Sequence, residues 1–361
     1  MMKLNIAYLA CAAAITGAGI GAAPPVAADH MIHVVLPGES IQTAVDAAEP
    51  GDTVLLTPGT YRQSVKVTTP DLTLRGMGRA TVLKPAATKP ATPKAPKAAE
   101  TCGENGNGIC VVGKKDKSIE GVTIADLTVT GFAKAGLFAV GTDGLTVRNV
   151  TAVENGVWGI AQERSVRSVF RKNTARDNGD AGLFLANTVR SDEGASDTQG
   201  TVVERNLLEG NRIGLTVRRL RNLTVAHNRV TGNCAGVFVV GDENAPRAGA
   251  LTVRDNRVAR NNKSCPKTPR LEALQGSGIV LTGAEDTLVT RNRVTDNAGP
   301  SSLSGGIVLF KSFVGTTSVR NRITDNVLEG NAPADLVNTD TGEGNTFQGN
   351  TCQASQPAGL C

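Results

Sequence analysis

The chain has 361 residues, which is enough for one large domain or two of ordinary size. Its formal net charge of +5 is too small and too evenly spread to indicate a nucleic-acid-binding protein. With 41 Gly but only 1 Trp, 2 Tyr and 8 Phe, its core must consist mainly of aliphatic side chains.

Residues 1–28 have the features of a secretory signal peptide. Lys3 supplies a positive charge, an apolar run rich in Ala and Gly follows, and cleavage is expected near Ala28. A membrane anchor is the alternative, but the small residues before Asp29 favour a secreted protein. No later segment is apolar enough to span a membrane.

Residues 29–60 predict a capping helix and the first strands of the fold. Ser40 is a suitable N-cap for a short helix, and the apolar residues that follow it share one helical face. Strands are expected at TVLL (53–56) and SVKV (64–67), with a Pro58-Gly59 turn between them. A short amphipathic helix before a run of strands is suited to cover an open end.

Residues 84–110 predict an exposed insertion that is rich in Pro, Ala and Lys and is closed by cysteines. Removal of the signal peptide would leave six cysteines, and an even number in an exported protein favours disulfides. We prefer the sequence-local pairing among the connectivities that six cysteines allow. It comprises Cys102–Cys110, Cys234–Cys265 and Cys352–Cys361.

From about residue 118 a short unit recurs along the chain. LTVAHNRVTGN (223–233), LTVRDNRVARN (251–261) and TLVTRNRVTDN (287–297) are nearly interchangeable. Each unit places two Asn five positions apart, and a second strand opened by Gly follows, as in GVFV (236–239). Because the apolar residues alternate with a period of two, each unit is a coil of short strands. Stacked coils give a solenoid of parallel sheets.

The regular Asn residues are predicted to be structural. Asn tolerates left-handed backbone angles and bonds locally, so we place it at the tight corners of the coils. Stacked corners would form ladders in which one amide bonds to the next. Gly is expected to let the backbone turn into the following strand. The Asn pairs are Asn173/Asn178, Asn206/Asn211, Asn228/Asn233, Asn256/Asn261, Asn292/Asn297, Asn326/Asn331 and Asn345/Asn350.

PGESIQTAVDAAEPGDTVLLTPGTY (37–61) and the repeated N-x-[VIL]-x-x-N units resemble the right-handed parallel β-helix, or pectin-lyase-like, superfamily. The resemblance implies an all-β, right-handed parallel β-helix over residues 61–361 with a short N-terminal capping helix. It does not fix an activity, because the superfamily includes lyases, polygalacturonases, uronan epimerases and phage tailspikes. Apart from an isolated Asn338-Thr339-Asp340, the polygalacturonase motifs are missing, as is the D-P-H signature of alginate epimerases.

A column of residues offers a candidate binding site. The column consists of the residue five positions after the Gly that opens each second strand. Because adjacent coils should lie about 4.8 Å apart, these residues would stack along the solenoid. Arg suits a planar carboxylate, so we predict a groove for an acidic polysaccharide; a solvated face with surface ion pairs is the alternative. The predicted substrate-binding residues are Trp158, Arg164, Asn187 and Lys311.

The resemblance also implies catalytic roles, because lyases of the superfamily commonly use Arg or Lys as the base, often with calcium. On this basis Arg218 or Arg219 is the candidate base and Glu163 the candidate to hold a cation. The second hypothesis is a non-catalytic glycan-binding, surface or maturation module. His30-Met31-x-His33 is either a copper site or a frayed terminus.

The position two residues after each of these Gly points outward and is mostly apolar. Either a long loop, 191–200 or 262–277, covers this stripe, or the stripe is a contact surface. A monomer is expected, because the helix and the C-terminal tail would close both ends of the solenoid. The stripe comprises Phe138, Ala161, Phe184, Thr216, Phe238, Val280 and Val308.

Overall fold

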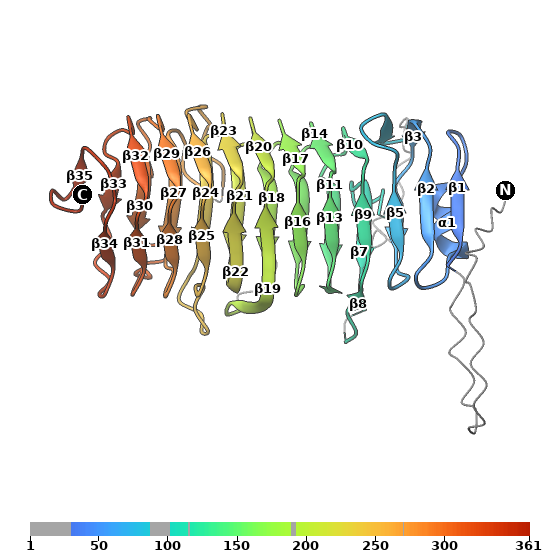
Figure 1. Cartoon of the computed structure of the whole chain (residues 1–361), viewed down its shortest axis with the longest axis horizontal. Helices are drawn as coiled ribbons and strands as arrows, with labels where there is room; N and C mark the ends of the chain where they lie inside the picture. Colours follow the sequence, from blue (N-terminus) through green and yellow to red (C-terminus); the bar gives the residue numbers. More distant parts are fainter. Residues whose placement is uncertain (1–29, 87–101, 115, 189–192, 270) are drawn as a thin grey trace, which may run out of the picture.

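The computed structural model describes residues 30–86, 102–114, 116–188, 193–269 and 271–361. Over these ranges the chain winds into coils that stack along one axis, and their strands form three long parallel sheets (Figure 1). The sheets, here named A, B and C, contain 12, 10 and 11 strands. The predicted all-β solenoid is confirmed. The signal-peptide prediction and most of the Pro/Ala/Lys-rich stretch lie outside the described residues.

Sheet A runs the whole length of the solenoid. Its strands follow the chain order because each coil contributes one strand to it. They are β1 (Ile32–Val35), β2 (Thr53–Leu56), β5 (Thr73–Arg75), β9 (Thr123–Ala125), β13 (Thr146–Arg148), β16 (Val169–Arg171), β19 (Ser196–Glu204), β22 (Leu220–Ala226), β25 (Thr252–Arg254), β28 (Leu288–Thr290), β31 (Arg322–Thr324) and β34 (Thr346–Gln348).

Sheet B contains the second strand of most coils, and these strands are short. They are β3 (Gly59–Arg62), β6 (Thr81–Lys84), β10 (Thr128–Thr130), β14 (Thr151–Val153), β17 (Thr174–Arg176), β20 (Leu207–Glu209), β23 (Arg229–Thr231), β26 (Arg257–Ala259), β29 (Arg293–Thr295) and β32 (Val327–Glu329).

Sheet C contains the strands that the Gly residues open. They are β4 (Val65–Val67), β7 (Ile109–Val112), β11 (Ala135–Val140), β15 (Trp158–Glu163), β18 (Ala181–Ala186), β21 (Ile213–Arg218), β24 (Ala235–Val240), β27 (Ser277–Thr282), β30 (Gly305–Phe310), β33 (Leu336–Asn338) and β35 (Ser355–Gln356). A separate pair is formed by β8 (Ile119–Glu120) and β12 (Thr142–Asp143).

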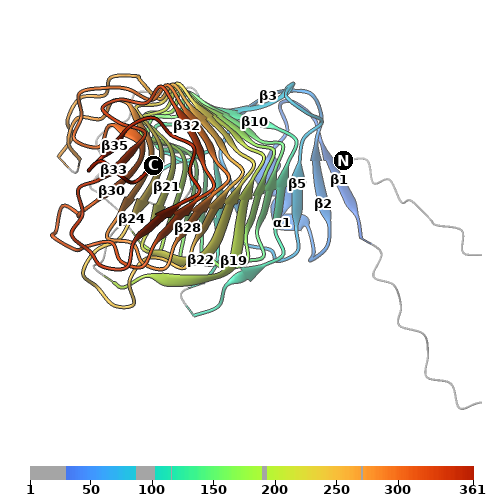
Figure 2. The same cartoon turned by 60° about the vertical axis from the view of Figure 1, so that its left-hand side comes forward.

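Figure 2, a view turned toward one end of the solenoid, shows the coils stacked behind one another, and the main apolar core lies inside them. In sheet A the middle residue of each short strand points inward, and in-register partners form an apolar column. Val147, Phe170, Val225 and Val253 in this column are fully buried. Thr224, between Leu223 and Val225, is half-exposed, which confirms the predicted alternation.

The N-terminal end has the predicted cap. Helix α1 (Ile41–Ala47) begins after Ser40, whose hydroxyl accepts the Thr43 N–H at 3.1 Å. The helix packs against β1, β2 and β4. β1 and β2, which lie within the predicted region 29–60 of cap helix and first strands, are strands of sheet A. The predicted Pro58-Gly59 turn leads into β3, a strand that the sequence analysis missed.

Two long Asn ladders join the coils. Their side-chain amides bond to one another along the axis with Nδ2–Oδ1 distances between 2.8 and 3.1 Å. The backbone N–H of Asn173 donates to the Asn206 side chain at its end of the first ladder. The first, between sheets A and B, comprises Asn173, Asn206, Asn228, Asn256, Asn292, Asn326 and Asn350. The second, between sheets B and C, comprises Asn155, Asn178, Asn211, Asn233, Asn261, Asn297 and Asn331.

The backbone reason given for Asn and Gly needs correction. Among the described residues, the left-handed corner position is the residue before each ladder Asn, such as Arg205 with φ 55° and His227 with φ 57°, and not the Asn itself. Gly182 does not have a positive φ. A Cβ there would lie 2.8 Å from the Asn211 amide nitrogen and from the Gly214 carbonyl. Gly is therefore required by the close approach of the ladder.

All three predicted disulfides are present, with Cα–Cα distances of 5.7, 6.0 and 5.5 Å in chain order. Cys110 lies in β7 of sheet C, so the predicted 84–110 insertion ends before Ile109. Within the described ranges no helix has the length and apolar character needed to cross a membrane.

Candidate functional site

The candidate site lies on the outward face of sheet C, where β15, β18 and β21 are neighbours. Glu163 pairs in register with Ala186, and Ala186 pairs with Arg218. The Arg164 N–H donates to the Asn187 carbonyl at 3.0 Å, which places these two residues on adjacent coils. The structure therefore brings together most of the residues predicted for the site.

Arg219 is one of the predicted catalytic residues, and it is buried, with 7 % of its surface exposed. Its Nε forms an ion pair with the carboxylate of Asp242, which is also buried. Its backbone adopts the left-handed conformation, with φ 51°. Because its guanidinium is buried and held by a buried carboxylate, this geometry favours Arg219 as a structural anchor rather than as a base.

Arg218 is the more accessible of the two candidate bases. It ends β21 on the outward face of sheet C and is partly buried. Its Nη1 donates to the Thr188 carbonyl at 2.7 Å, which fixes the side chain against the loop after β18. Glu163 is half-exposed at the equivalent end of β15, two coils away and so about 10 Å along the axis.

Two residues predicted to bind substrate contact Glu193 and Gly194, just before β19, instead. Asn187 is buried, and its Nδ2 donates to the Glu193 and Gly194 carbonyls at 3.1 and 2.7 Å. Arg164 lies 3.3 Å from the Glu193 carboxylate, and both side chains are 54 % exposed. For Arg164 the structure thus shows the surface ion pair that was the alternative to a substrate contact.

Trp158 lies at the opposite end of β15 from Glu163, about 16 Å away along the strand. Its ring stacks on Phe184 with 4.5 Å between centroids and an interplanar angle of 14°. The indole N–H donates to Asp180 at 3.2 Å. These contacts hold the ring in one orientation while it remains partly exposed. An aromatic ring that is fixed and partly exposed is suited to pack against a sugar ring.

The apolar stripe on sheet C is largely covered, as one of the two hypotheses predicted. Phe184, Phe238 and Val280 are buried in a second apolar cluster with Cys265 and Leu274 of the loop over 262–276. Ser196–Glu204 is strand β19, so the other proposed cover is partly a strand of sheet A.

Arg212 fixes the covering loop by donating to the Pro266 and Glu272 carbonyls at 2.6 and 3.0 Å. Burial lowers the pKa of Arg212, although the charge of Asp180 acts in the opposite direction. The role of Arg212 was missed at the sequence level because its partners are carbonyl groups of a distant loop.

Lys311 follows β30 on the same side of sheet C, but three coils beyond Arg219 and thus about 14 Å along the axis. It is exposed. The structure places it in the predicted column but not beside the other candidate residues. A ligand would have to span several coils to contact both Lys311 and Arg218.

No group of three or more His, Cys, Asp or Glu in the described ranges is arranged to hold a metal ion. His33 Nε2 lies 2.9 Å from the Asp52 carboxylate, which also accepts the Met31 and Glu49 N–H groups. Burial raises the pKa of Asp52, but these hydrogen bonds together lower it below its usual value. His33 and the Met31 backbone are therefore held by Asp52.

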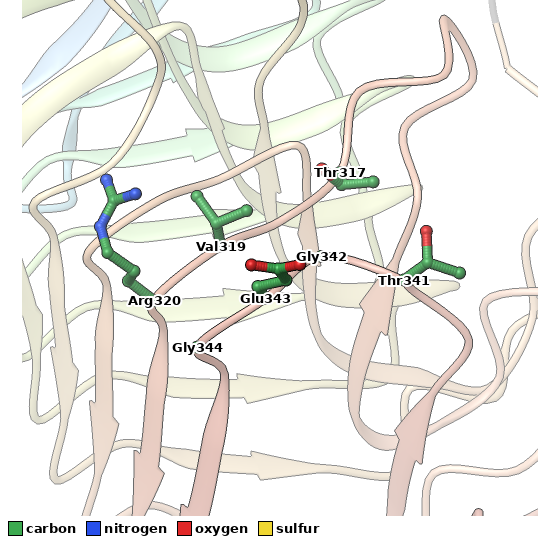
Figure 3. A pocket seen from close by; sticks show the side chains of 7 residues that line it. All are labelled: Thr317, Val319, Arg320, Thr341, Gly342, Glu343 and Gly344. Carbon is green, nitrogen blue, oxygen red and sulfur yellow. The ribbon is translucent and has the colours of Figure 1, made fainter.

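A surface hollow of about 580 Å³ lies near the C-terminal end, and sequence reasoning did not identify it. Figure 3 shows Arg320 and Thr341 on opposite sides of it. The Arg320 guanidinium is already bound by Asp286, at 2.8 and 2.9 Å, and by Glu285 at 3.0 Å. This pairing holds the pKa of Asp286 below its usual value. An exposed hollow whose arginine is neutralised is a weaker candidate than sheet C.

Two family models match the sequence. The one described as "Right handed beta helix region" matches residues 100–249, and the one described as "Periplasmic copper-binding protein (NosD)" matches residues 190–359. No curated protein matches the chain in sequence.

Several solved structures share the fold. The A-module of the mannuronan C-5 epimerase AlgE4 from Azotobacter vinelandii aligns with a TM-score of 0.57 and 18 % identity, over 88 % of this chain and 91 % of that one. An alginate lyase from Paenibacillus aligns with a TM-score of 0.54 and 15 % identity, over 86 % of this chain and 99 % of that one. The lidless DFA-IIIase from Arthrobacter chlorophenolicus in complex with GF2 aligns with a TM-score of 0.55 and 12 % identity, over 88 % of this chain and 94 % of that one.

The three stacked sheets, the family match and these structural neighbours define the class of the protein. The chain has the right-handed parallel β-helix fold, and residues 100–249 match the family model of that description. Its three disulfides are typical of proteins that fold outside the reducing cytoplasm.

Proposed function

We propose that the chain is an extracytoplasmic protein that binds an acidic, uronate-containing polysaccharide on sheet C and cleaves it as a lyase. The observation that carries the proposal is the presence of Trp158 and Arg218 on one outward face, with a fixed aromatic ring at one end and a guanidinium at the other. The named substrates of two structural neighbours, mannuronan and alginate, support the same substrate class.

In the proposed reaction a base removes the proton beside the uronate carboxylate. The electron pair forms a carbon–carbon double bond, and the glycosidic oxygen leaves and takes up a proton. Arg218 is the candidate base, and Arg219 holds the end of β21 through Asp242. Glu163 remains the candidate to hold a cation such as calcium, and no step above depends on that ion.

The test follows the ultraviolet absorbance of unsaturated uronate ends on pectate, alginate and glycosaminoglycans, with and without calcium. We expect one polymer to give a rise in absorbance, and Arg218→Ala to slow it about a hundredfold or more with little change in Tm. Arg62→Ala, on the outward face of sheet B, is the matched control and should retain full turnover. Unchanged turnover in Arg218→Ala would remove the assignment of the base.

A non-catalytic periplasmic module is the second candidate, and the match of residues 190–359 to the NosD family favours it. The six described cysteines form disulfides and are not available as copper ligands. Polysaccharide binding without any rise in absorbance would support this candidate over the lyase.

A further inference from the structure

Sheet B carries three stacked arginines on its outward face. Arg229, Arg257 and Arg293 are direct partners on the adjacent strands β23, β26 and β29, so their backbones lie about 4.8 Å apart. All three side chains are exposed. Arg293 lies 3.4 Å from the Glu329 carboxylate. Arg229 and Arg257 have no such partner in the part of the chain that the structure describes. We call these three residues the arginine ladder.

The fold itself does not require arginine at these positions. The same outward column holds Thr128, Thr151, Thr174 and Leu207 on the preceding coils and Val327 on the following one. Such residues suit a strand, whereas like charges directly opposite one another destabilise it. Three consecutive arginines therefore carry a cost that an anionic ligand would offset.

The surroundings of the ladder keep its charge available. The next outward residues on the same strands are Thr231, Ala259 and Thr295, which are uncharged and buried. The Asp255 carboxylate at the neighbouring corner is already held by Arg254 and Arg291. Exposed Arg205 and Arg260 occupy corners near the ladder, and the exposed acids nearby include Glu209, Asp296 and Glu329, the partner of Arg293.

The shape of the ladder selects among anions. Its charges repeat at the coil spacing along the solenoid axis, so the matching ligand is a linear polymer with an acid group at regular intervals. The outward positions of sheet B hold no Trp, Tyr or Phe in its described strands. Stacking platforms for nucleic-acid bases are thus missing, and a polysaccharide is the better match.

We propose that the arginine ladder binds a linear polyuronate that lies along the solenoid axis on sheet B. The guanidinium groups donate paired hydrogen bonds to successive carboxylates. Each exposed contact is weak, and the affinity comes from several contacts made by one polymer. This surface is separate from the sheet C site, and the proposal does not depend on lyase activity.

The test measures the affinity of the mature protein for polygalacturonate and alginate at low and physiological salt, with dextran as the neutral polymer. Arg229→Thr/Arg257→Thr/Arg293→Thr installs the residue found elsewhere in the column. The control Arg62→Thr/Arg79→Thr/Arg176→Thr makes the same charge change at exposed arginines that are not in register. We expect the ladder variant to bind about tenfold more weakly and with less dependence on salt, and the control to stay within about twofold.

Equal losses in both variants would show an effect of net charge alone and would overturn the proposal. Equal binding of dextran, or tighter binding of single-stranded DNA or anionic vesicles than of polyuronate, would overturn the choice of ligand. If the triple variant does not fold, Arg257→Thr alone must still weaken binding severalfold. Turnover of short uronate oligosaccharides reports the sheet C site separately, because it should be lost in Arg218→Ala and retained in the ladder variant.

Discussion

Each buried side-chain amide of the Asn ladders makes several hydrogen bonds, so a single one should contribute strongly to the stability of the fold. The Asn233 Nδ2 donates to the Leu208 carbonyl at 3.0 Å and to Asn261 at 2.8 Å, while its Oδ1 accepts two bonds from Asn211. Because the side chain is fully buried, Asn233→Ala leaves donors and acceptors unpaired. We expect it to lower the free energy of unfolding by about 2–4 kcal/mol in denaturant titrations.

An exposed amide provides the control for this prediction. Gln348 lies on the surface of β34, and Gln348→Ala should change stability by less than about 0.5 kcal/mol. Equal effects of the two substitutions would show that the ladder is not a major source of stability.

Arg218 and Arg219 are adjacent, yet they should respond differently to truncation. Arg219→Ala leaves the buried Asp242 carboxylate without its partner and should cost about 3 kcal/mol or more. Arg218→Ala removes a partly exposed side chain and should cost much less. Thermal unfolding of the two variants measures the difference, and a stable Arg219→Ala protein would contradict the anchoring role.

Asp255 is expected to make the thermal stability of the protein depend on pH in the acid range. Hydrogen bonds from Arg291 are the main cause that lowers the pKa of Asp255 below 3.8; burial opposes them and Arg254 adds to them. Because the pKa is lower in the folded state, the stabilisation is present above the unfolded value and is lost as the pH falls through the folded one. Asp255→Asn should lower Tm by about 2 °C or less near neutral pH.

The acid series provides the decisive comparison. The difference in Tm between wild type and Asp255→Asn should shrink as the pH falls below about 3.8. A difference that stays constant down to this range would show that Asp255 contributes through its shape and not through its charge.

At the scale of elements, the loop over 262–276 behaves as a fixed cover of sheet C. The Cys234–Cys265 disulfide and the two hydrogen bonds of buried Arg212 hold it over Phe238 and Val280. Arg212→Ala should loosen the loop, so that limited proteolysis cuts it roughly tenfold faster while the circular dichroism of the strands is unchanged.

Lys267→Ala is the matched control within the same loop. Lys267 forms an ion pair with Glu272 at 2.6 Å, but both side chains are exposed. Its removal should leave the rate of cleavage nearly unchanged. Equal acceleration by both variants would show that Arg212 has no special part in holding the cover.

The elements also show what the sequence can and cannot predict. The two-residue period and the recurring Asn identified the coils, because both follow from local geometry that repeats. Strand β3 was missed because Pro58-Gly59 has the appearance of a turn, although Gly59 pairs with Thr81 in sheet B. The column around Arg164 was located from spacing alone. The burial of Arg219 was not predicted from the sequence, because its partner Asp242 belongs to the next coil.

For the whole molecule, the solenoid presents two long faces of different character. Sheet C combines a covered apolar stripe with the partly exposed Trp158 and Arg218, and sheet B carries the arginine ladder. Both faces extend along one axis and are thus suited to an elongated ligand (Figure 1). The three disulfides and the cap helix lie at different points along this axis, and both faces belong to one continuous solenoid.

The most direct test of polysaccharide binding on sheet C is a fluorescence titration of Trp158. It is the single Trp of the chain, so its emission reports this face alone. Uronate oligosaccharides should change the emission in a saturable way, and neutral oligosaccharides of the same length should not. An unchanged spectrum at polyuronate concentrations that saturate binding would contradict the account, because the ligand would then occupy another surface.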